Sequence, residues 1–275
     1  MAEKLGIVAG GGILPKRLVD RCRKEGRPYS LACLKDFALS ETAGDGDCLW
    51  CRIGEVGKIL SYFKKNDVRQ IVMIGGVRRP SLLQLRPDWW TAKFLMKIGF
   101  KAFGDDNLLS LIIKSVEAEG FQFIGIHDVM PDLLAGEGVW GKIEPDEQAW
   151  SDINHGVKIA LGLGAMDVGQ SVVVQQGIVL GVEAVEGTDA LILRCKDLKR
   201  EGVGGVLVKT KKPQQEKRAD LPTIGVQTVV NVHEAGLRGI AIQAGNALVA
   251  DRAAVVAKAD ELGIFIVGVK GDDAG

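Results

Sequence analysis

The chain has 275 residues, 47% of them hydrophobic and 36 of them glycine, which is enough for two α/β domains that each bury a core. Its 35 basic and 35 acidic residues balance, so no global charge favours nucleic acid as a partner. No basic region leads into an apolar run at the N-terminus, and no apolar run approaches about 20 residues, so we expect a cytoplasmic protein without a signal peptide or a membrane-spanning helix.

The first half of the chain alternates predicted strands with predicted helices. The strands are expected at residues 4–10, 29–34, 69–77 and 121–130, and the helices at 15–26, 55–66 and 104–120. Such alternation is typical of a parallel sheet with helices on both faces. We therefore expect an α/β fold that begins with a Rossmann-like parallel-sheet domain over residues 1–132.

The second half also mixes helices and strands, but less regularly. Turn formers and acidic residues at 133–145 predict a linker. A second, mixed α/β domain is expected over residues 146–275. Its predicted elements are a helix at 146–163, two β-branched runs within 171–183, a helix at 187–200, a strand at 205–210, a helix at 226–236, an apolar segment at 239–250, a helix ending at Gly263 and a strand at 264–269.

Two predicted strands end in glycines, Gly10-Gly11-Gly12 and Gly75-Gly76. Ligands of doubly wound sheets bind beyond the carboxyl ends of strands, where glycine lets the backbone approach phosphate oxygens. The third glycine of a dinucleotide motif is missing, because Ile13, Leu14 and Pro15 follow Gly12. Asp36 stands roughly where a ribose-binding acid would lie. The residues alone leave open a nucleotide site or a tight turn without a ligand.

A second stretch, "EAVEGTD", packs three carboxylates and a hydroxyl into a predicted strand-to-helix junction. These residues are Glu183, Glu186, Thr188 and Asp189. Oxygen ligands of this kind suit Mg²⁺. The alternative is a helix that begins with Thr188 as N-cap and acids in its first turn.

A third stretch places Asp220 before "LPTIG", just ahead of a predicted helix. This pattern suits a fixed carboxylate beside a phosphate-facing turn that includes Thr223 and Gly225. The basic residues that could neutralise phosphate charge are Lys209, Lys211 and Arg218. The alternative is a solvated basic loop.

A fourth stretch, residues 78–103, interleaves Trp, Phe, Leu and Met with Arg and Lys. A basic amphipathic helix of this kind can lie on a bilayer surface or line an acyl-chain groove. It can equally pack on its own domain or form a dimer interface.

The cysteines and histidines indicate no metal or redox centre. Cys48 and Cys51 form an isolated CxxC, which we interpret as two ordinary cysteines near a buried strand, and the odd total of five cysteines fits a reducing compartment. His127 is expected at a strand end, and His155 and His233 in helices, so a His-rich or Ser-His-Asp site is not indicated.

Six stretches taken together resemble the LpxI family of UDP-2,3-diacylglucosamine pyrophosphatases, which acts in lipid A biosynthesis. They are "KLGIVAGGGILP", "IVMIGGVRRP", "GDDNLLS", "EAVEGTDALI", "GVLVKTKKPQQEKRADLPTIGVQT" and "GIAIQAGNALVADR". The resemblance runs from residue 4 to residue 269. Its most specific part is EGTD followed by DLPTIG.

The resemblance implies Mg²⁺-dependent hydrolysis of UDP-2,3-diacylglucosamine to UMP and 2,3-diacylglucosamine 1-phosphate (lipid X), with water attacking the β-phosphorus. It implies a ligand held between a Rossmann-like domain and a C-terminal catalytic domain, and it maps the family's essential aspartate onto Asp220. An inner-membrane surface and a second copy of the chain are the further implied partners, with no nucleic acid. The segment 87–103 is our candidate for the membrane contact.

Under this hypothesis Asp220 ligates Mg²⁺ or orients the water, and Lys209 offsets phosphate charge. The further metal candidates are Glu183, Glu186 and Asp189. The substrate-binding candidates are Gly10, Gly11, Gly12, Ile13, Gly75, Gly76, Thr188, Thr223 and Gly225, with Asp36 or Thr188 against ribose or base. An NAD(P)-dependent oxidoreductase and a non-enzymatic nucleotide-binding protein are the alternative functions.

Overall fold

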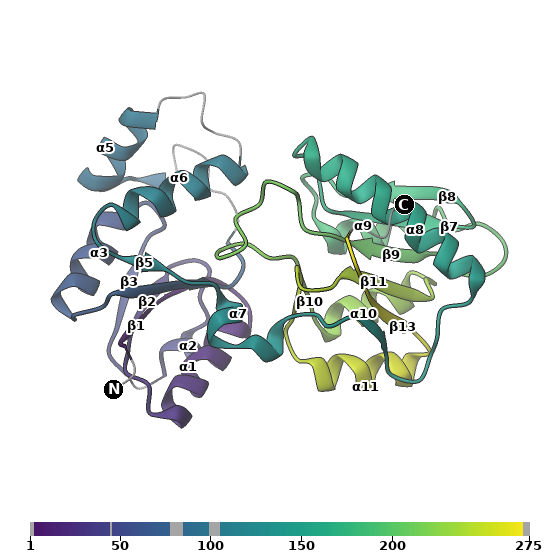
Figure 1. The fold of residues 1–275 in the computed structure, drawn as a ribbon, viewed down its shortest axis with the longest axis horizontal. Helices are drawn as coiled ribbons and strands as arrows, with labels where there is room; N and C mark the ends of the chain where they lie inside the picture. Colours follow the sequence, from purple (N-terminus) through teal and green to yellow (C-terminus); the bar gives the residue numbers. More distant parts are fainter. Residues whose placement is uncertain (1–2, 45, 78–84, 99–104, 272–275) are drawn as a thin grey trace. The chain divides into compact units, whose positions relative to one another are not determined.

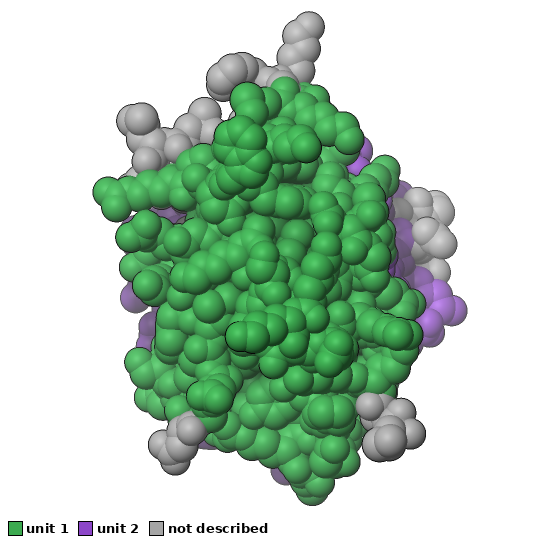
Figure 2. All heavy atoms as spheres, turned by 90° about the vertical axis from the view of Figure 1, so that its left-hand side faces the viewer, with its two compact units in different colours: residues 1–131 green, residues 132–275 purple. Residues whose placement is uncertain are grey.

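The computed structural model describes residues 3–44, 46–77, 85–98 and 105–271. The chain divides into two compact units, Met1–Pro131 and Asp132–Gly275, coloured green and purple in Figure 2. Each unit has its own sheet (Figure 1).

Unit 1 is built on a five-stranded parallel sheet in the order β3-β2-β1-β4-β5. Its strands are β1 (Leu5–Ala9), β2 (Tyr29–Leu34), β3 (Cys48–Cys51), β4 (Gln70–Ile74) and β5 (Gln122–Phe123). Its helices are α1 (Leu14–Glu25), α2 (Ser40–Ala43), α3 (Val56–Lys65), α5 (Trp89–Ile98), α6 (Asp105–Glu117) and α7 (Ile126–Val129). The strand order reverses direction between β1 and β4, so these neighbours form the topological switch point of the sheet. The predicted Rossmann-like parallel sheet is confirmed.

The strand predicted at 121–130 is wrong beyond Phe123. Helix α7 follows instead, because the Asp128 carboxylate accepts a hydrogen bond from the backbone N–H of Gly125 at 2.8 Å, and the N–H of Asp128 donates to the Gly125 carbonyl at 3.1 Å. This reciprocal cap begins a helical turn while Ile126 and Val129 stay buried. His127 consequently lies in α7 and not at a strand end.

Unit 2 contains a six-stranded mixed sheet in the order β6-β13-β11-β9-β7-β8, beside a two-stranded pair, β10-β12. Its strands are β6 (Gly138–Trp140), β7 (Ser171–Gln175), β8 (Ile178–Val182), β9 (Val206–Lys209), β10 (Thr223–Ile224), β11 (Gly239–Gln243), β12 (Leu248–Val249) and β13 (Phe265–Val269). Its helices are α8 (Glu147–Ala165), α9 (Thr188–Cys195), α10 (Val226–Glu234) and α11 (Arg252–Leu262). The mixed α/β second domain is confirmed. Residues 133–145, predicted as a linker, include β6, which pairs with β13.

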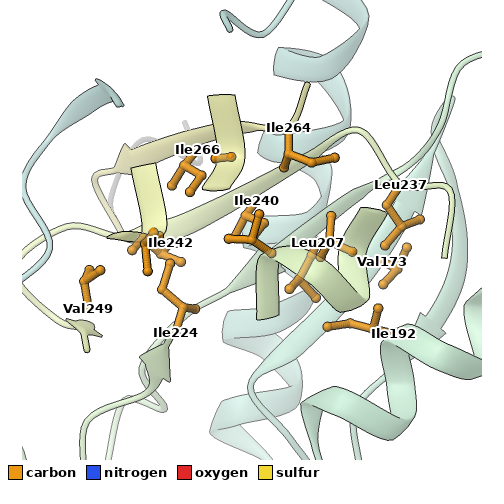
Figure 3. Close-up of a cluster of buried hydrophobic side chains, with 14 of the residues drawn as sticks. Val173, Ile192, Leu207, Ile224, Leu237, Ile240, Ile242, Val249, Ile264 and Ile266 are labelled. Carbon is orange, nitrogen blue, oxygen red and sulfur yellow. The ribbon is translucent and has the colours of Figure 1, made fainter. Parts of the chain in front are cut away.

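The two faces of the larger sheet bury separate cores, because side chains alternate along each strand. Val172 and Val174 of β7 pack with α8 on one face. Val173 packs on the other face with side chains of α9, α10 and α11, including Ile192 (Figure 3). Each fully buried Leu, Ile or Val contributes about 1.5–3 kcal/mol. The β-branched run at 171–175 is therefore a strand covered on both sides.

A buried carboxylate holds the β7–β8 turn. Gln176 and Gly177 have positive φ values of 51° and 77°, the conformation of a two-residue hairpin turn. Asp152 of α8, fully buried, accepts hydrogen bonds from both of their backbone N–H groups at 2.9 and 2.7 Å. This contact fixes the hairpin, and hence the end of β7 and the start of β8, against α8.

None of the helices among the described residues is both long and apolar enough to cross a bilayer.

Candidate active site

In unit 1, the glycine loops after β1 and β4 bind each other across the switch point. The N–H of Gly11 donates to the Gly76 carbonyl at 2.8 Å, and the N–H of Gly76 donates to the Gly11 carbonyl at 3.1 Å. A Cβ at Gly75, whose φ is 99°, would lie 2.5 Å from the Gly11 oxygen, and one at Gly10 would lie 2.7 Å from the Gly75 oxygen. These glycines are thus required for the approach of one loop to the other, whether or not a phosphate binds there.

Several backbone N–H groups of the two glycine loops are not available to bind an anion, because they already donate hydrogen bonds within the protein. The N–H groups of Gly10, Gly11 and Gly76 already donate to protein carbonyls. Within the described residues, no partner is found for the N–H groups of Gly12 and Ile13. Ile13 precedes α1, which begins without a side-chain cap. If a phosphate binds at this end of β1, we expect it at these two amides.

Asp36 lies in the turn directly after β2, is exposed, and has a positive φ of 72°. This is the place at which a Rossmann-like sheet presents a ribose-binding acid. Its contact with ribose stays a prediction.

In unit 2, polar side chains gather at one edge of the sheet. Strands β8, β9 and β11 run in the same direction, so their carboxyl ends meet at this edge. Glu183 follows β8, Lys209 ends β9, and Gln243 ends β11. All three are at most 9% exposed, although each carries a charged or polar group. Buried polar groups concentrated at the carboxyl ends of strands mark a candidate ligand site.

The Lys209 amine belongs to a hydrogen-bonded chain at this edge. Its Nζ donates to Thr188 Oγ1 at 2.8 Å and to the Thr223 carbonyl at 3.4 Å. Thr188 Oγ1 donates its proton to Glu183 Oε1 at 3.0 Å. The Ser171 hydroxyl, 3.3 Å from Thr188 Oγ1, must then be the donor to it, because a threonine has a single hydroxyl proton. The chain links β7, β8, β9, β10 and α9.

Burial lowers the pKa of Lys209, since desolvation disfavours the ammonium form, while the carboxylates of Glu183, Asp189 and Asp220 act in the opposite direction. Three of the four predicted metal-ligating acids therefore lie close enough to interact with this amine. The fourth, Glu186, instead pairs with Arg194 at 2.8 Å, and this hydrogen bond lowers the pKa of Glu186.

The predicted metal ligands do not form a preformed coordination site among the described residues. Among the residues that the structure describes, no group of three or more His, Cys, Asp or Glu side chains is arranged to hold a metal ion. Asp189 accepts a hydrogen bond from Asn231 at 3.0 Å. Glu183, in contrast, has a buried Oε2 without a hydrogen-bond partner. A carboxyl oxygen left without a hydrogen-bond partner at a buried site is suited to a cation or a ligand donor.

Thr188 does not act as a helix cap. Gly187, with a φ of 82°, is the N-cap of α9, and Thr188 is the first helical residue. The hydroxyl of Thr188 bonds to Lys209 and Glu183. The capping interpretation of this threonine is therefore wrong.

Asp220 lies at the end of an ordered loop, exposed to solvent. Its Oδ2 accepts a hydrogen bond from the side-chain amide of Gln215 at 2.5 Å. Lys211, one of the predicted phosphate-neutralising residues, donates from Nζ to the carbonyls of Lys212, Pro213 and Gln215. The ammonium group of Lys211 therefore stabilises the backbone of the loop at 212–215.

The other predicted residues of this segment lie beside Asp220. Arg218 pairs with Glu216 at 3.0 Å and lowers the pKa of that carboxyl. Thr223 supplies the carbonyl that accepts from Lys209. Gly225 precedes α10, with its N–H donating to Thr228 Oγ1 at 3.3 Å. Substrate contacts of Thr223 and Gly225 stay predictions.

Sequence reasoning missed several residues of this edge, all of them uncharged. They are Ser171, Thr210, Gln215, Asn231 and Gln243. Thr210 Oγ1 is buried without a hydrogen-bond partner, and Gln243 Oε1 accepts from the N–H of Lys211 at 2.9 Å. The positions directly after predicted strands could have indicated Thr210 and Gln243, whereas nothing in the local pattern indicates Gln215 or Asn231.

One thiol of the CxxC pair, that of Cys51, is buried and held protonated. Cys48 and Cys51 are free and lie on β3. Burial raises the pKa of Cys51 to about 11 and that of the neighbouring Cys33 to about 12. Thiols held protonated in this way are poor nucleophiles and poor metal ligands.

Helix α5 covers residues 89–98 of the basic aromatic segment, and residues 85–88 precede it, whereas residues 78–84 and 99–103 lie outside the described residues. Thr91 and Phe94 are buried. Trp89 and Met96 are 80% and 70% exposed, and their spacing of seven positions places them on one face of the helix. The helix thus packs on unit 1 by one face and exposes large apolar side chains on another.

Comparison with known proteins gives consistent matches over both units. The model of the LpxI N-terminal domain matches residues 4–133, and that of the LpxI C-terminal domain matches residues 136–267. A protein of Caulobacter vibrioides (strain ATCC 19089 / CIP 103742 / CB 15), named UDP-2,3-diacylglucosamine pyrophosphatase LpxI, is 41% identical over 97% of this chain and 98% of its own length. Among solved structures, CobK precorrin-6A reductase reaches a TM-score of 0.34 at 8% identity, over 98% of this chain and 88% of that one. That last likeness carries no argument.

Proposed function

The chain belongs to the LpxI family, and from this premise we propose that it is a UDP-2,3-diacylglucosamine pyrophosphatase of lipid A biosynthesis. The products are UMP and 2,3-diacylglucosamine 1-phosphate. The observation that carries the proposal is the 41% identity to a relative of this name over nearly the whole of both chains. The buried lysine and its surrounding acids in unit 2 support it, because they suit chemistry on a charged phosphate.

Lys209 is proposed to neutralise charge on the pyrophosphate. Its amine makes two hydrogen bonds, to Thr188 and Thr223, so a protonated amine has a third N–H to offer an incoming oxygen. An anion at this site raises the lowered pKa of Lys209, because a nearby negative charge favours the ammonium form. Substrate binding and protonation of the amine therefore support each other.

Asp220 is proposed to orient the attacking water and accept its proton. The water oxygen forms the new bond to the β-phosphorus, the bond between the β-phosphorus and the bridging oxygen breaks, and UMP leaves with that oxygen. Such in-line displacement requires mainly charge neutralisation and alignment. The exposed carboxylate of Asp220, held through one oxygen by Gln215, supports this role.

Mg²⁺ is the proposed cofactor, and the donor set fits it in part. Mg²⁺ is usually held by one or two carboxylates together with substrate phosphates and water, so a cage of three acids is not needed. Glu183 would hold it through its unpartnered Oε2, and Asp220 would be a second ligand only in place of its proposed role as proton acceptor. When bound, the ion would stabilise negative charge on the phosphoryl oxygens. Asp189 and Glu186, which already have protein partners, are weaker candidates.

A single assay tests the activity. Purified protein is incubated with UDP-2,3-diacylglucosamine in Mg²⁺, with and without EDTA, and UMP is measured. We expect UMP release that EDTA abolishes. Asp220→Ala should leave a folded protein that binds substrate but barely hydrolyses it. Absence of UMP from the unmodified protein would refute the activity, and near-normal turnover by Asp220→Ala would refute the role of the aspartate.

We further propose that the exposed face of α5 contacts the membrane surface in which the acyl chains of the substrate reside. Trp89 and Met96 would insert at the interface, while the exposed Lys93 and Lys97 on the same helix attract anionic headgroups. The chain is proposed to be cytoplasmic and homodimeric. Flotation with anionic vesicles tests the contact: Trp89→Ser with Met96→Ser should weaken binding, whereas Lys158→Ser on α8 should not.

A further inference from the structure

Gln215 has a buried side-chain amide that is hydrogen-bonded to the Asp220 carboxylate. It is 5% exposed, although it lies in a loop between β9 and β10. Its Nε2 donates to Asp220 Oδ2, and its Oε1 accepts from the backbone N–H of Lys212 at 3.3 Å. Both ends of the amide are therefore bonded, and a buried amide bonded at both ends has a fixed orientation.

The direction of these bonds is determined by chemistry. A backbone N–H can only donate, so the oxygen of the Gln215 amide must face Lys212. The NH₂ group consequently faces Asp220, which needs a donor when ionised. The amide cannot reverse without placing two donors opposite each other and its oxygen against a carboxylate. The N–H of Lys212 thus fixes the orientation of the Gln215 amide, and this amide in turn holds one oxygen of the Asp220 carboxylate.

The loop that carries Gln215 is anchored on both sides. The Lys211 ammonium donates to the Gln215 carbonyl at 3.1 Å, and the Lys211 N–H donates to Gln243 at the end of β11. On the other side, Gln214 donates to the Gly164 carbonyl at the end of α8 at 2.8 Å. Gln215 is therefore a rigid support, whereas Asp220 is exposed and has no second side-chain partner among the described residues.

We propose that Gln215 is a positioning residue for the Asp220 carboxylate in the hydrolytic reaction, an inference that rests on the proposed role of Asp220. It directs one carboxylate oxygen toward the protein and leaves the other for water or a ligand. Without it, the Asp220 side chain rotates freely in solvent. Misplacement of a reacting group by about 1 Å costs on the order of 100-fold in rate.

The test compares two replacements that separate positioning from loop structure. Gln215→Glu keeps the shape and the acceptor for Lys212, but replaces the donor to Asp220 with a like charge. Gln215→Leu removes both bonds. Gln214→Leu, in the same loop and bonded only to a backbone carbonyl, is the matched control. The kinetic constants kcat and KM and the thermal unfolding midpoint are measured for each variant.

We expect kcat to fall about 10-fold to 100-fold in both Gln215 variants, with KM within about threefold of the unmodified protein. Gln215→Glu should be at least as impaired as Gln215→Leu, with a smaller change in unfolding midpoint. If Gln215 only supports the loop, Gln215→Glu restores kcat to the level of Gln214→Leu, and the proposal is overturned. Unchanged kcat in Gln215→Leu overturns it as well.

Asp220→Asn in the same series separates the two possible failures. An active Asp220→Asn variant overturns the role of the aspartate, and that of Gln215 with it. An inactive Asp220→Asn variant together with a fully active Gln215→Leu variant overturns the role of Gln215 alone.

Discussion

Replacing Lys209 with methionine removes the amine while keeping a side chain of similar length in the same buried position. The two hydrogen bonds that are lost, to Thr188 at 2.8 Å and Thr223 at 3.4 Å, contribute about 1.5–3 kcal/mol each where the donor is charged. Their loss is offset because the amine no longer has to be desolvated. We expect the free energy of unfolding to change by less than about 2 kcal/mol. Removing a charge-stabilising donor from a water-excluded site should lower kcat about 100-fold to 1000-fold, which is about 2.7–4 kcal/mol.

The two quantities are measured separately, kcat by UMP release and stability by urea unfolding, with Lys158→Met on the exposed face of α8 as control. The pH dependence adds a check. Because the pKa of Lys209 in the folded protein lies below its ordinary 10.5, the unfolded chain binds this proton more tightly. The unmodified protein should therefore gain stability relative to Lys209→Met as pH rises toward that value. A kcat within about threefold of normal, or a loss of stability by the unmodified protein relative to Lys209→Met as pH rises, would refute the reasoning.

Three further outcomes are expected. Gly75→Ala should destabilise unit 1 by more than about 2 kcal/mol, because the φ of Gly75 is 99° and the new Cβ would lie 2.5 Å from a carbonyl oxygen. Gly76→Ala is the control: a Cβ there meets open space, so the variant should be nearly neutral in thermal unfolding. Asp152→Ala should lower the free energy of unfolding in urea by about 2–4 kcal/mol, because both N–H groups of the β7–β8 turn lose their hydrogen-bond acceptor. A decrease of less than about 1 kcal/mol would contradict the role of Asp152 in holding this turn. Cys33 and Cys51, with pKa values of about 12 and about 11, should resist Ellman's reagent near neutral pH until the chain unfolds, and rapid labelling of either thiol in the folded protein would show that assignment to be wrong.

The fold was predictable where strands are apolar on both faces, and in unit 1 because β1 and β4 are each followed by glycines. The run at 171–175 carries three valines that face opposite cores at alternate positions, which is the pattern of a covered strand. Helix α7 was missed because its four residues are too few for a helical period. The signal that decides it, the reciprocal bond between Gly125 and Asp128, also resembles an ordinary turn.

The site was predictable where a charged residue follows a strand. Lys209 and Glu183 both do so, and the parallel direction of β8 and β9 brings them to one edge. The amides were not predictable, because a neutral side chain in a loop carries no periodic signal. Asn231 contacts an acid 42 positions away, and Gln243 contacts a loop 32 positions away. Only the folded chain brings these pairs together.

The two hydrogen bonds between Gly11 and Gly76 join the loop after β1 to the loop after β4 in unit 1. Here the two loops are joined before any ligand binds, so much of the ordering entropy has already been lost on folding. A ligand that approaches the amides of Gly12 and Ile13 therefore meets a preorganised surface. Its binding loses less free energy to loop ordering than binding to two separate, mobile loops would.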